Sequence, residues 1–224
     1  MKIYFFAILG IILIIILGLN NINYFSINEL KGQGYYIGNL HTHTIASDGE
    51  NDYNQMVMEA VRLGFDFIAI TDHSTISSTA LLLCPLDKRI LCILGEEVST
   101  LQGHVVALGI TKIIPSGLNA NETINLIHEQ NGLAIAAHPG IDLGLTPDLL
   151  SIFDFDAVEC NSALMPNDQL TGCNNFYIKV YNSDAHNLEM LRTSANNCTL
   201  ANLTWQAIKE SILAETCSLF SSII

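Results

Sequence analysis

Short apolar runs alternate with segments of helical periodicity from residue 35 to residue 215. Because parallel strands need long connections, which are usually helices, this alternation predicts an α/β fold built on a parallel sheet. The predicted strands cover residues 35–40, 65–70, 89–95, 104–110, 133–137, 155–160 and 175–181. The predicted helices cover residues 54–64, 121–132 and 204–215, and a glycine ends each of the first two.

The composition suits one globular domain. A chain of 224 residues that is 50% hydrophobic can bury a substantial core. Its formal net charge is −13, and it has only nine lysines and arginines. Nucleic-acid grooves rely on clustered Lys and Arg, so nucleic acid is not an expected partner. An acidic chain can still bind a phosphate when metal ions supply the positive charge.

The first 20 residues stand apart from this pattern. An apolar run from Ile3 to Leu19 follows Lys2, and its length is about the shortest that spans a bilayer as a helix. We expect a transmembrane anchor over residues 1–20, a polar tether over 21–34 and the domain over 35–224. A cleaved signal peptide is the alternative, although "GLNNINYFS" offers no small-x-small cleavage site. Lys2 and Lys31 give little charge asymmetry across the run, and we expect the domain to face outside.

The six cysteines fall at irregular spacings without a C-x-x-C motif. Neither a thiolate zinc site nor a disulfide framework can be recognised from this spacing. We expect reduced cysteines that mostly fill space in the core.

Histidines gather where the predicted strands end. The segments "NLHTH", "ITDH", "LGEE", "AAHPG" and "YNSDAH" each lie at the carboxyl end of a strand, and in an α/β barrel these ends converge on one face. His104 begins its strand instead, and an antiparallel or irregular strand there would bring it to the same face. The candidate ligands are His41, His43, Asp48, His73, Glu97, His104, His138, Asp184 and His186.

Nine nitrogen and oxygen donors are too many for one ion and suit a cluster of two or three. Imidazole and carboxylate without thiolate favour zinc, manganese or iron over calcium. Alternate residues of a strand point the same way, so His41 and His43 can bind one ion together.

The motifs "HTHTIASDG", "AITDH", "GEEVS" followed by "GHVVALG", "AAHPG" and "NSDAH" resemble, in this order, those of the PHP (polymerase and histidinol phosphatase) domain family. The resemblance runs from about residue 36 to the C-terminus. It implies a distorted seven-stranded β/α barrel, similar to a TIM barrel, with up to three metal ions on its carboxyl face. It assigns one ion to His41, His43, Glu97 and Asp184, a second to Glu97, His104 and His138, and a third to Asp48, His73 and His186. Glu97 is preferred to Glu96 because the second glutamate of "GEEVS" aligns with the ligand.

The expected activity is metal-dependent hydrolysis of small phosphate esters by a hydroxide formed at the ions. No G-x-S-x-G or Q-A-C-type context supports a serine or cysteine nucleophile. Two alternatives stay open, an exonuclease that acts on nucleic-acid ends and a metal-binding module without turnover. Arg192 is a candidate for holding a substrate phosphate, and Asp72 is a candidate for orienting a ligand histidine.

Overall fold

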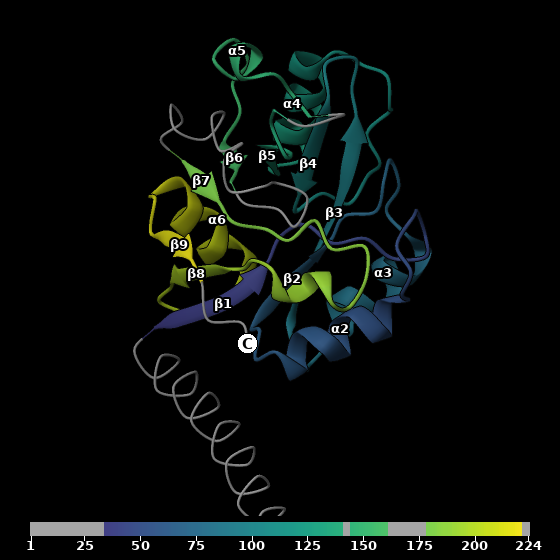
Figure 1. Ribbon diagram of the computed structural model, residues 1–224, viewed down its shortest axis with the longest axis vertical. Helices are drawn as coiled ribbons and strands as arrows, with labels where there is room; N and C mark the ends of the chain where they lie inside the picture. The colour runs from purple at the N-terminus through teal and green to yellow at the C-terminus, as the bar shows by residue number, and fades with distance from the viewer. Residues whose placement is uncertain (1–33, 141–143, 161–177, 221–224) are drawn as a thin grey trace, which may run out of the picture. The chain divides into compact units, whose positions relative to one another are not determined.

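A computed structural model describes residues 34–140, 144–160 and 178–220 (Figure 1). The predicted anchor over residues 1–20 lies outside these ranges, so it stays a prediction. Within the described ranges, no helix has the length and apolar character needed to cross a membrane.

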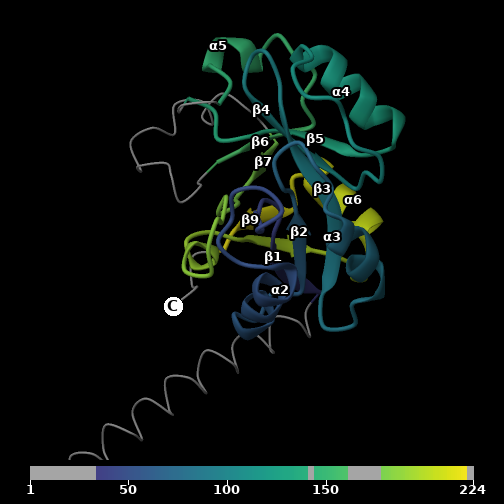
Figure 2. The same cartoon turned by 90° about the vertical axis from the view of Figure 1, so that its right-hand side faces the viewer.

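Nine strands form one sheet in the described part of the chain, in the order β7-β6-β5-β4-β3-β2-β1-β8-β9. The strands are β1 Tyr35–Asn39, β2 Phe67–Ile70, β3 Leu91–Ser99, β4 His104–Leu108, β5 Leu133–Ala136, β6 Ala157–Glu159, β7 Lys179–Val180, β8 Asn196–Thr199 and β9 Cys217–Leu219. The sheet curves until β7 and β9, at its two ends, contact each other. The result is a nearly closed, barrel-like sheet, seen from the side in Figure 2.

Most of the expected strand directions are found. β1, β2 and β3 pair in parallel, and so do β5, β6 and β7. β4 is antiparallel to both β3 and β5. His104, the first residue of β4, therefore lies at the same end of the sheet as the last residues of β3, where Ser99 is its direct partner.

The helices are α2 Tyr53–Arg62, α3 Ser78–Leu83, α4 Ala120–Glu129, α5 Pro147–Leu150 and α6 Trp205–Leu213, with 3-10 turns η1 Cys84–Leu86 and η3 Met190–Arg192. Side-chain caps define where the longer ones begin. Asp52 accepts a hydrogen bond from the backbone N–H of Gln55 and the Gln55 side chain accepts from that of Asp52, which is a capping box. Asn119 and Thr204 cap α4 and α6, and each side chain accepts one backbone N–H of the first turn.

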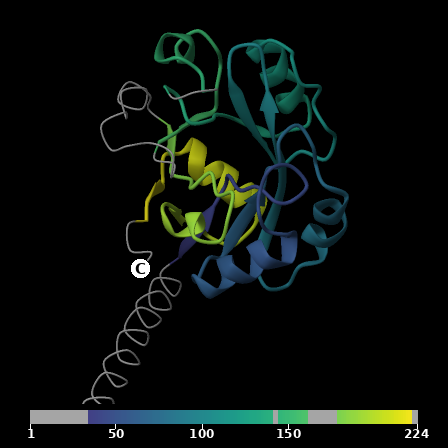
Figure 3. The same cartoon turned by 45° about the vertical axis from the view of Figure 1, so that its right-hand side comes forward.

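The concave side of the sheet is filled by α6. Its residues Ile208 and Ile212 belong to a buried cluster that includes Phe67 of β2, Val106 of β4 and Ala157 of β6. Figure 3 shows this helix, in yellow, within the curve of the sheet. The α2 and α4 helices bury their apolar faces in two other clusters, so the core lies on both sides of the sheet.

The expectation of seven strands was wrong for the described chain. β8 and β9, which α6 separates along the chain, form an additional antiparallel pair that follows β1 at the end of the sheet. The polar sequence of β8, "NNCT", hides it from an analysis of apolar runs, and β9 follows the helix that was expected to end the fold.

The expectation of reduced cysteines was also wrong. Disulfides join Cys84 to Cys92 and Cys198 to Cys217, and no free cysteine is present among the described residues. Cys198 and Cys217 are direct partners in the antiparallel register of β8 and β9. Spacing along the chain could not reveal this pairing, because the two strands themselves were not predicted.

Candidate metal centre

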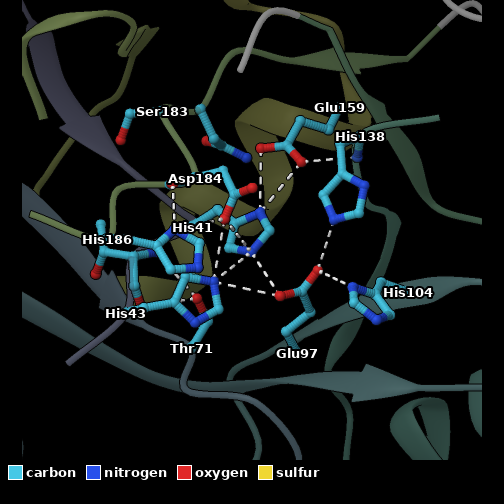
Figure 4. A network of polar contacts seen from close by, with 12 residues as sticks. His41, His43, Thr71, Glu97, His104, His138, Glu159, Ser183, Asp184 and His186 are labelled. Atoms are coloured by element: carbon cyan, nitrogen blue, oxygen red, sulfur yellow. Dashed lines mark hydrogen bonds and ion pairs between the residues drawn. The ribbon is translucent and has the colours of Figure 1, made fainter. Parts of the chain in front are cut away.

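The nine candidate ligands gather at one end of the barrel-like sheet, where the loops after the strands meet. Figure 4 labels all of them except Asp48 and His73. Backbone hydrogen bonds hold two of the contributing segments together. The N–H of His43 donates to the carbonyl of Ala185 at 2.9 Å, and the N–H of Ala185 donates to the carbonyl of His41 at 3.3 Å. This short parallel bridge sets the segment that carries Asp184 and His186 against the end of β1.

Two of the candidate ligands have unusual backbone conformations. His138 has φ 26° and Asp184 has φ 50°, a region that residues other than glycine rarely occupy. Such conformations cost energy and persist where the surroundings impose them, often at functional sites. Their occurrence at two of the nine positions shows that the fold directs these side chains into the cluster.

Four buried donor atoms form a compact group: Nε2 of His41, Nε2 of His43, Oε2 of Glu97 and Oδ1 of Asp184. The two imidazole nitrogens lie 3.1 Å apart, and each lies 3.2 Å from Glu97 Oε2. Asp184 Oδ1 lies 3.3 Å from the nitrogen of His41 and 3.1 Å from that of His43. With bonds of about 2.0–2.1 Å, a tetrahedral zinc ion holds its ligand atoms about 3.3–3.4 Å apart, so this group has the size of a metal site.

The other carboxylate oxygen of Glu97 faces two more histidines. Oε1 lies 3.0 Å from Nδ1 of His104 and 2.9 Å from Nε2 of His138. Each oxygen of Glu97 thus belongs to a different set of imidazoles. This is the geometry of a carboxylate that bridges two ions.

A third group lies at the solvent edge. Asp48 Oδ2 lies 3.4 Å from Nε2 of His73 and 3.4 Å from Nε2 of His186. Its other oxygen, Oδ1, lies 3.6 Å from Nδ1 of His43. The side chain of Asp48 is 54% exposed, whereas those of His41 and His43 are fully buried. The three groups therefore run from the interior of the barrel outwards.

Several buried polar atoms of the cluster have no hydrogen-bond partner among the residues that the structure describes. They are Nδ1 of His43, Nδ1 of His138, Oε2 of Glu97 and Oδ1 of Asp184. Leaving such atoms buried and unsatisfied costs free energy, so each needs an explanation. Cations between the donors supply one, and the residues present therefore fit a metal cluster.

Without metal ions, protons on the histidines compensate the buried carboxylate charges. Burial acts to lower the pKa of His43, but contacts with Asp184 and Glu97 outweigh it and raise that pKa to about 9. Burial acts to raise the pKa of Asp184, but His41 and His43 outweigh it and lower that pKa to about 2. Metal ions bind deprotonated ligands, so they would replace these protons.

The structure places Asp72 and Arg192 outside the histidine cluster. Asp72 accepts hydrogen bonds from the backbone N–H of Thr44 at 2.7 Å and the Ser47 hydroxyl at 2.9 Å, so it holds the loop after β1 and orients no ligand histidine. Arg192 donates to Glu59 Oε1 on α2 at 2.9 Å. Neither geometry supports the role expected from the sequence.

Glu159, the last residue of β6, is the part of the site that sequence reasoning missed. Its carboxylate accepts from Nδ1 of His41 at 3.1 and 3.2 Å and from the backbone N–H of His138 at 2.9 Å. The signal was present in "FDAVEC", because a glutamate at the end of a buried strand is unusual. It faces the same side of the sheet as Ala157, which lines the concave core.

A barrel-like α/β sheet with buried His, Glu and Asp clusters at its strand ends defines the class of protein as one with a candidate multinuclear metal site. The PHP domain model matches residues 39–212, and the chain belongs to the PHP family.

Three similar proteins show how far the likeness extends. The uncharacterized protein MJ1587 of Methanocaldococcus jannaschii is 34% identical over 119 residues, which are 52% of this chain and 69% of that protein. A two-domain protein of Bacteroides vulgatus, containing a predicted PHP-like metal-dependent phosphoesterase, superposes with a TM-score of 0.68 at 18% identity, over 83% of this chain and 64% of that one. The lesion-specific endonuclease PfuEndoQ of Pyrococcus furiosus gives 0.64 at 17% identity, over 83% and 57%. This chain thus spans less than two thirds of either structure, and both show the fold alone.

Proposed function

We propose that this protein is a metal-dependent phosphoesterase that acts on small phosphorylated compounds. One observation carries the proposal, a compact group of four buried donor atoms from His41, His43, Glu97 and Asp184. The two histidine nitrogens lie 3.1 Å apart, and each lies 3.1–3.3 Å from both carboxylate oxygens. Two of them, Glu97 Oε2 and Asp184 Oδ1, have no hydrogen-bond partner in the described part of the chain. Such a set fits a divalent transition-metal ion, with zinc, manganese and iron as the candidates.

The ligand assignment follows the three groups. His41, His43, Glu97 and Asp184 would hold one ion, and Glu97 with His104 and His138 a second. Asp48, His73 and His186 would hold a third. When bound, these ions would supply Lewis acidity and a water of lowered pKa at the phosphoryl group.

The chain's own residues decide where a substrate can lie. His41 and His43 are fully buried and keep water from the inner ion position. The side chains of His73 and His186 are 26% and 23% exposed, and Asp48 beside them is more exposed still. A phosphate ester would therefore reach the cluster from the Asp48 edge.

Charge also favours ions as the phosphate-binding groups. Within the described ranges, no hydrogen bond or ion pair joins an arginine or lysine to the cluster. Arg62 and Arg192 pair with Glu59, and Arg89 pairs with Asp87. The segments outside those ranges after residue 33 contain neither residue type. A dianionic phosphate would thus depend on metal ions for its positive partners.

Two other activities remain to be separated from this one. An exonuclease would bind nucleic acid, for which the net charge of −13 is unfavourable. Comparing hydrolysis of a nucleoside monophosphate with that of a short labelled oligonucleotide distinguishes it. A binding module without turnover would take up metal and hydrolyse nothing. A screen of phosphomonoesters and phosphodiesters with added manganese or zinc distinguishes that.

For location, we propose a single N-terminal anchor with the domain outside the cytosol. The apolar run from Ile3 to Leu19 supports the anchor. The disulfides support the oxidising side, because such bonds are rare in reducing compartments. The anchor predicts that the protein stays with membranes under high-salt and alkaline washing. A soluble mature protein that begins near residue 21 would show a cleaved signal peptide instead.

A further inference from the structure

Glu159 is a fully buried carboxylate that contacts two candidate ligands without belonging to any of the three donor groups. It lies at the end of β6, where its backbone partner is Val180 of β7. The next residue continues the pairing, because the Cys160 N–H donates to the Val180 carbonyl at 2.8 Å. The Glu159 side chain is thus built on a strand held at its end by a neighbouring strand.

Its contacts determine which nitrogen of His41 carries a proton. An ionised carboxylate only accepts hydrogen bonds, so the His41 Nδ1 that lies 3.1 and 3.2 Å from its two oxygens must be the N–H donor. That leaves a lone pair on Nε2. Nε2 is the His41 atom that lies among His43, Glu97 and Asp184.

Its second contact reaches the other side of Glu97. Glu159 Oε2 accepts from the backbone N–H of His138 at 2.9 Å. His138 has φ 26°, and this hydrogen bond helps to hold it in that rare conformation. Its imidazole Nε2 faces Glu97 Oε1. One carboxylate therefore supports a ligand of the first group and a ligand of the second.

We infer that Glu159 is a positioning residue for the metal cluster: it fixes His41 in the tautomer that presents Nε2 to the first ion and holds the His138 backbone for the second. The inference rests on the proposed function, since it concerns how the same site is loaded. Carboxylates that orient metal-bound histidines in this way commonly contribute about 10- to 100-fold to metal affinity.

The substitution Glu159→Gln separates the two contacts. A glutamine has one acceptor oxygen, which the fixed N–H of His138 requires. That oxygen, at the Oε2 position, also lies 3.1 Å from Nδ1 of His41, whereas the NH₂ group replaces the Oε1 that lies 3.2 Å from it. The Nδ1–H therefore loses one of its two acceptors and the negative charge that favours a proton on Nδ1. The variant keeps the support of His138 and weakens the preference of His41 for the tautomer that presents Nε2 to the first ion. It should weaken the first ion and leave the second nearly unchanged.

Glu96→Gln is the matched control. Glu96 is also fully buried and also accepts a backbone N–H, that of Ile114 at 2.5 Å. Among the described residues, no hydrogen bond or ion pair joins its side chain to the histidine cluster. Both substitutions replace a buried carboxyl group by an amide and conserve the shape of the side chain. Only one of them touches a candidate ligand.

The test uses the full-length chain in mild detergent, freed of metal and titrated with Zn²⁺ or Mn²⁺ against a chelating dye. Unfolding of the metal-free proteins is measured alongside, and so is the visible spectrum after Co²⁺ loading. We expect Glu159→Gln to bind its tightest ion about 10- to 100-fold more weakly than the wild type, with an altered Co²⁺ spectrum. Glu96→Gln should match the wild type in both. The metal-free Glu159→Gln variant should still unfold cooperatively.

Two results would count against the inference, and they can be told apart. If the wild type binds ions and Glu159→Gln binds them equally well with the same Co²⁺ spectrum, Glu159 is only structural and this inference alone is wrong. If the wild type binds no ion, the proposed function is wrong and the inference is wrong with it.

Discussion

Glu97 Oε2 lies 3.2 Å from Nε2 of His43, and the two atoms do not form a hydrogen bond. The other oxygen of Glu97 faces His104 and His138. Oε1 has hydrogen-bond partners in His104 and His138, whereas Oε2 has none among the described residues. A cation between Oε2 and the imidazoles would supply the missing partner. Glu97 is thus the residue that joins the two inner donor groups.

Glu97→Gln should therefore cause the largest loss of metal among single ligand substitutions. An amide offers one neutral oxygen where two charged ones are needed, so one inner position loses a ligand and the other keeps only a weaker one. We expect less than one equivalent of bound ion and loss of hydrolysis, measured by elemental analysis after reconstitution.

His138→Ala is the comparison for Glu97→Gln, because His138 contacts only one oxygen of Glu97. It should keep the ion of the first group. If Glu97→Gln retained as much metal as His138→Ala, the bridging role would be wrong.

His43→Ala and His186→Ala should abolish hydrolysis and leave a folded barrel. These side chains lie at the strand ends, and the apolar clusters that stabilise the sheet do not contain them. A ligand that binds only the folded state stabilises it according to the logarithm of its saturation. Thermal unfolding with and without metal should thus show a smaller metal-induced rise for both variants. Full activity with an undiminished rise in either one would contradict the ligand assignment.

The sequence predicted the alternation of strands and helices because each element carries its own periodicity. It also predicted that histidines from distant segments would meet, because they follow strands whose carboxyl ends share one face. The reversed β4 was needed to bring His104 there, and the structure shows it. The role of Glu159 could not be predicted, since a strand-end glutamate reveals its partners only when the pairing of β6 is known. The antiparallel pair of β8 and β9 and its disulfide could not be predicted either, because these segments have weak apolar patterns.

Glu96 predicts a pH dependence of stability. Burial raises the pKa of Glu96 to about 7, and the hydrogen bond from Ile114 offsets this only in part. The folded state then keeps a proton that the unfolded chain loses near its ordinary pKa of about 4.3. Stability should therefore fall as pH rises from about 4.5 to about 7, with no further change from this residue above that.

Glu96→Gln removes this titration and keeps an oxygen for the Ile114 amide. The variant should match the wild type near pH 4.5 and exceed its stability at pH 8, by at most about 3 kcal/mol. Denaturant unfolding at both pH values, with a chelator present, measures the difference. A variant less stable than the wild type at pH 8 would show that the ionised carboxylate is stabilised in the fold.

The disulfide between β8 and β9 should contribute to stability. Cys198 and Cys217 are 19 residues apart, and constraining a loop of that length in the unfolded chain is worth about 3 kcal/mol. The double substitution of both cysteines by serine should lower the free energy of unfolding by about this amount. Reductant should destabilise the wild type and have a smaller effect on the variant, which keeps the Cys84–Cys92 bond. Unchanged wild-type unfolding in reductant would contradict a structural role for either bond.

The most direct test of the central claim is hydrolysis of phosphate esters by the full-length chain after its metal content has been measured. The wild type should bind two to three equivalents of Zn²⁺ or Mn²⁺ and release phosphate from a chromogenic phosphomonoester. A chelator should stop the reaction, added metal should restore it, and Glu97→Gln should show neither activity nor restoration. A wild-type chain that carries its ions and hydrolyses none of a panel of phosphomonoesters and phosphodiesters would contradict the claim.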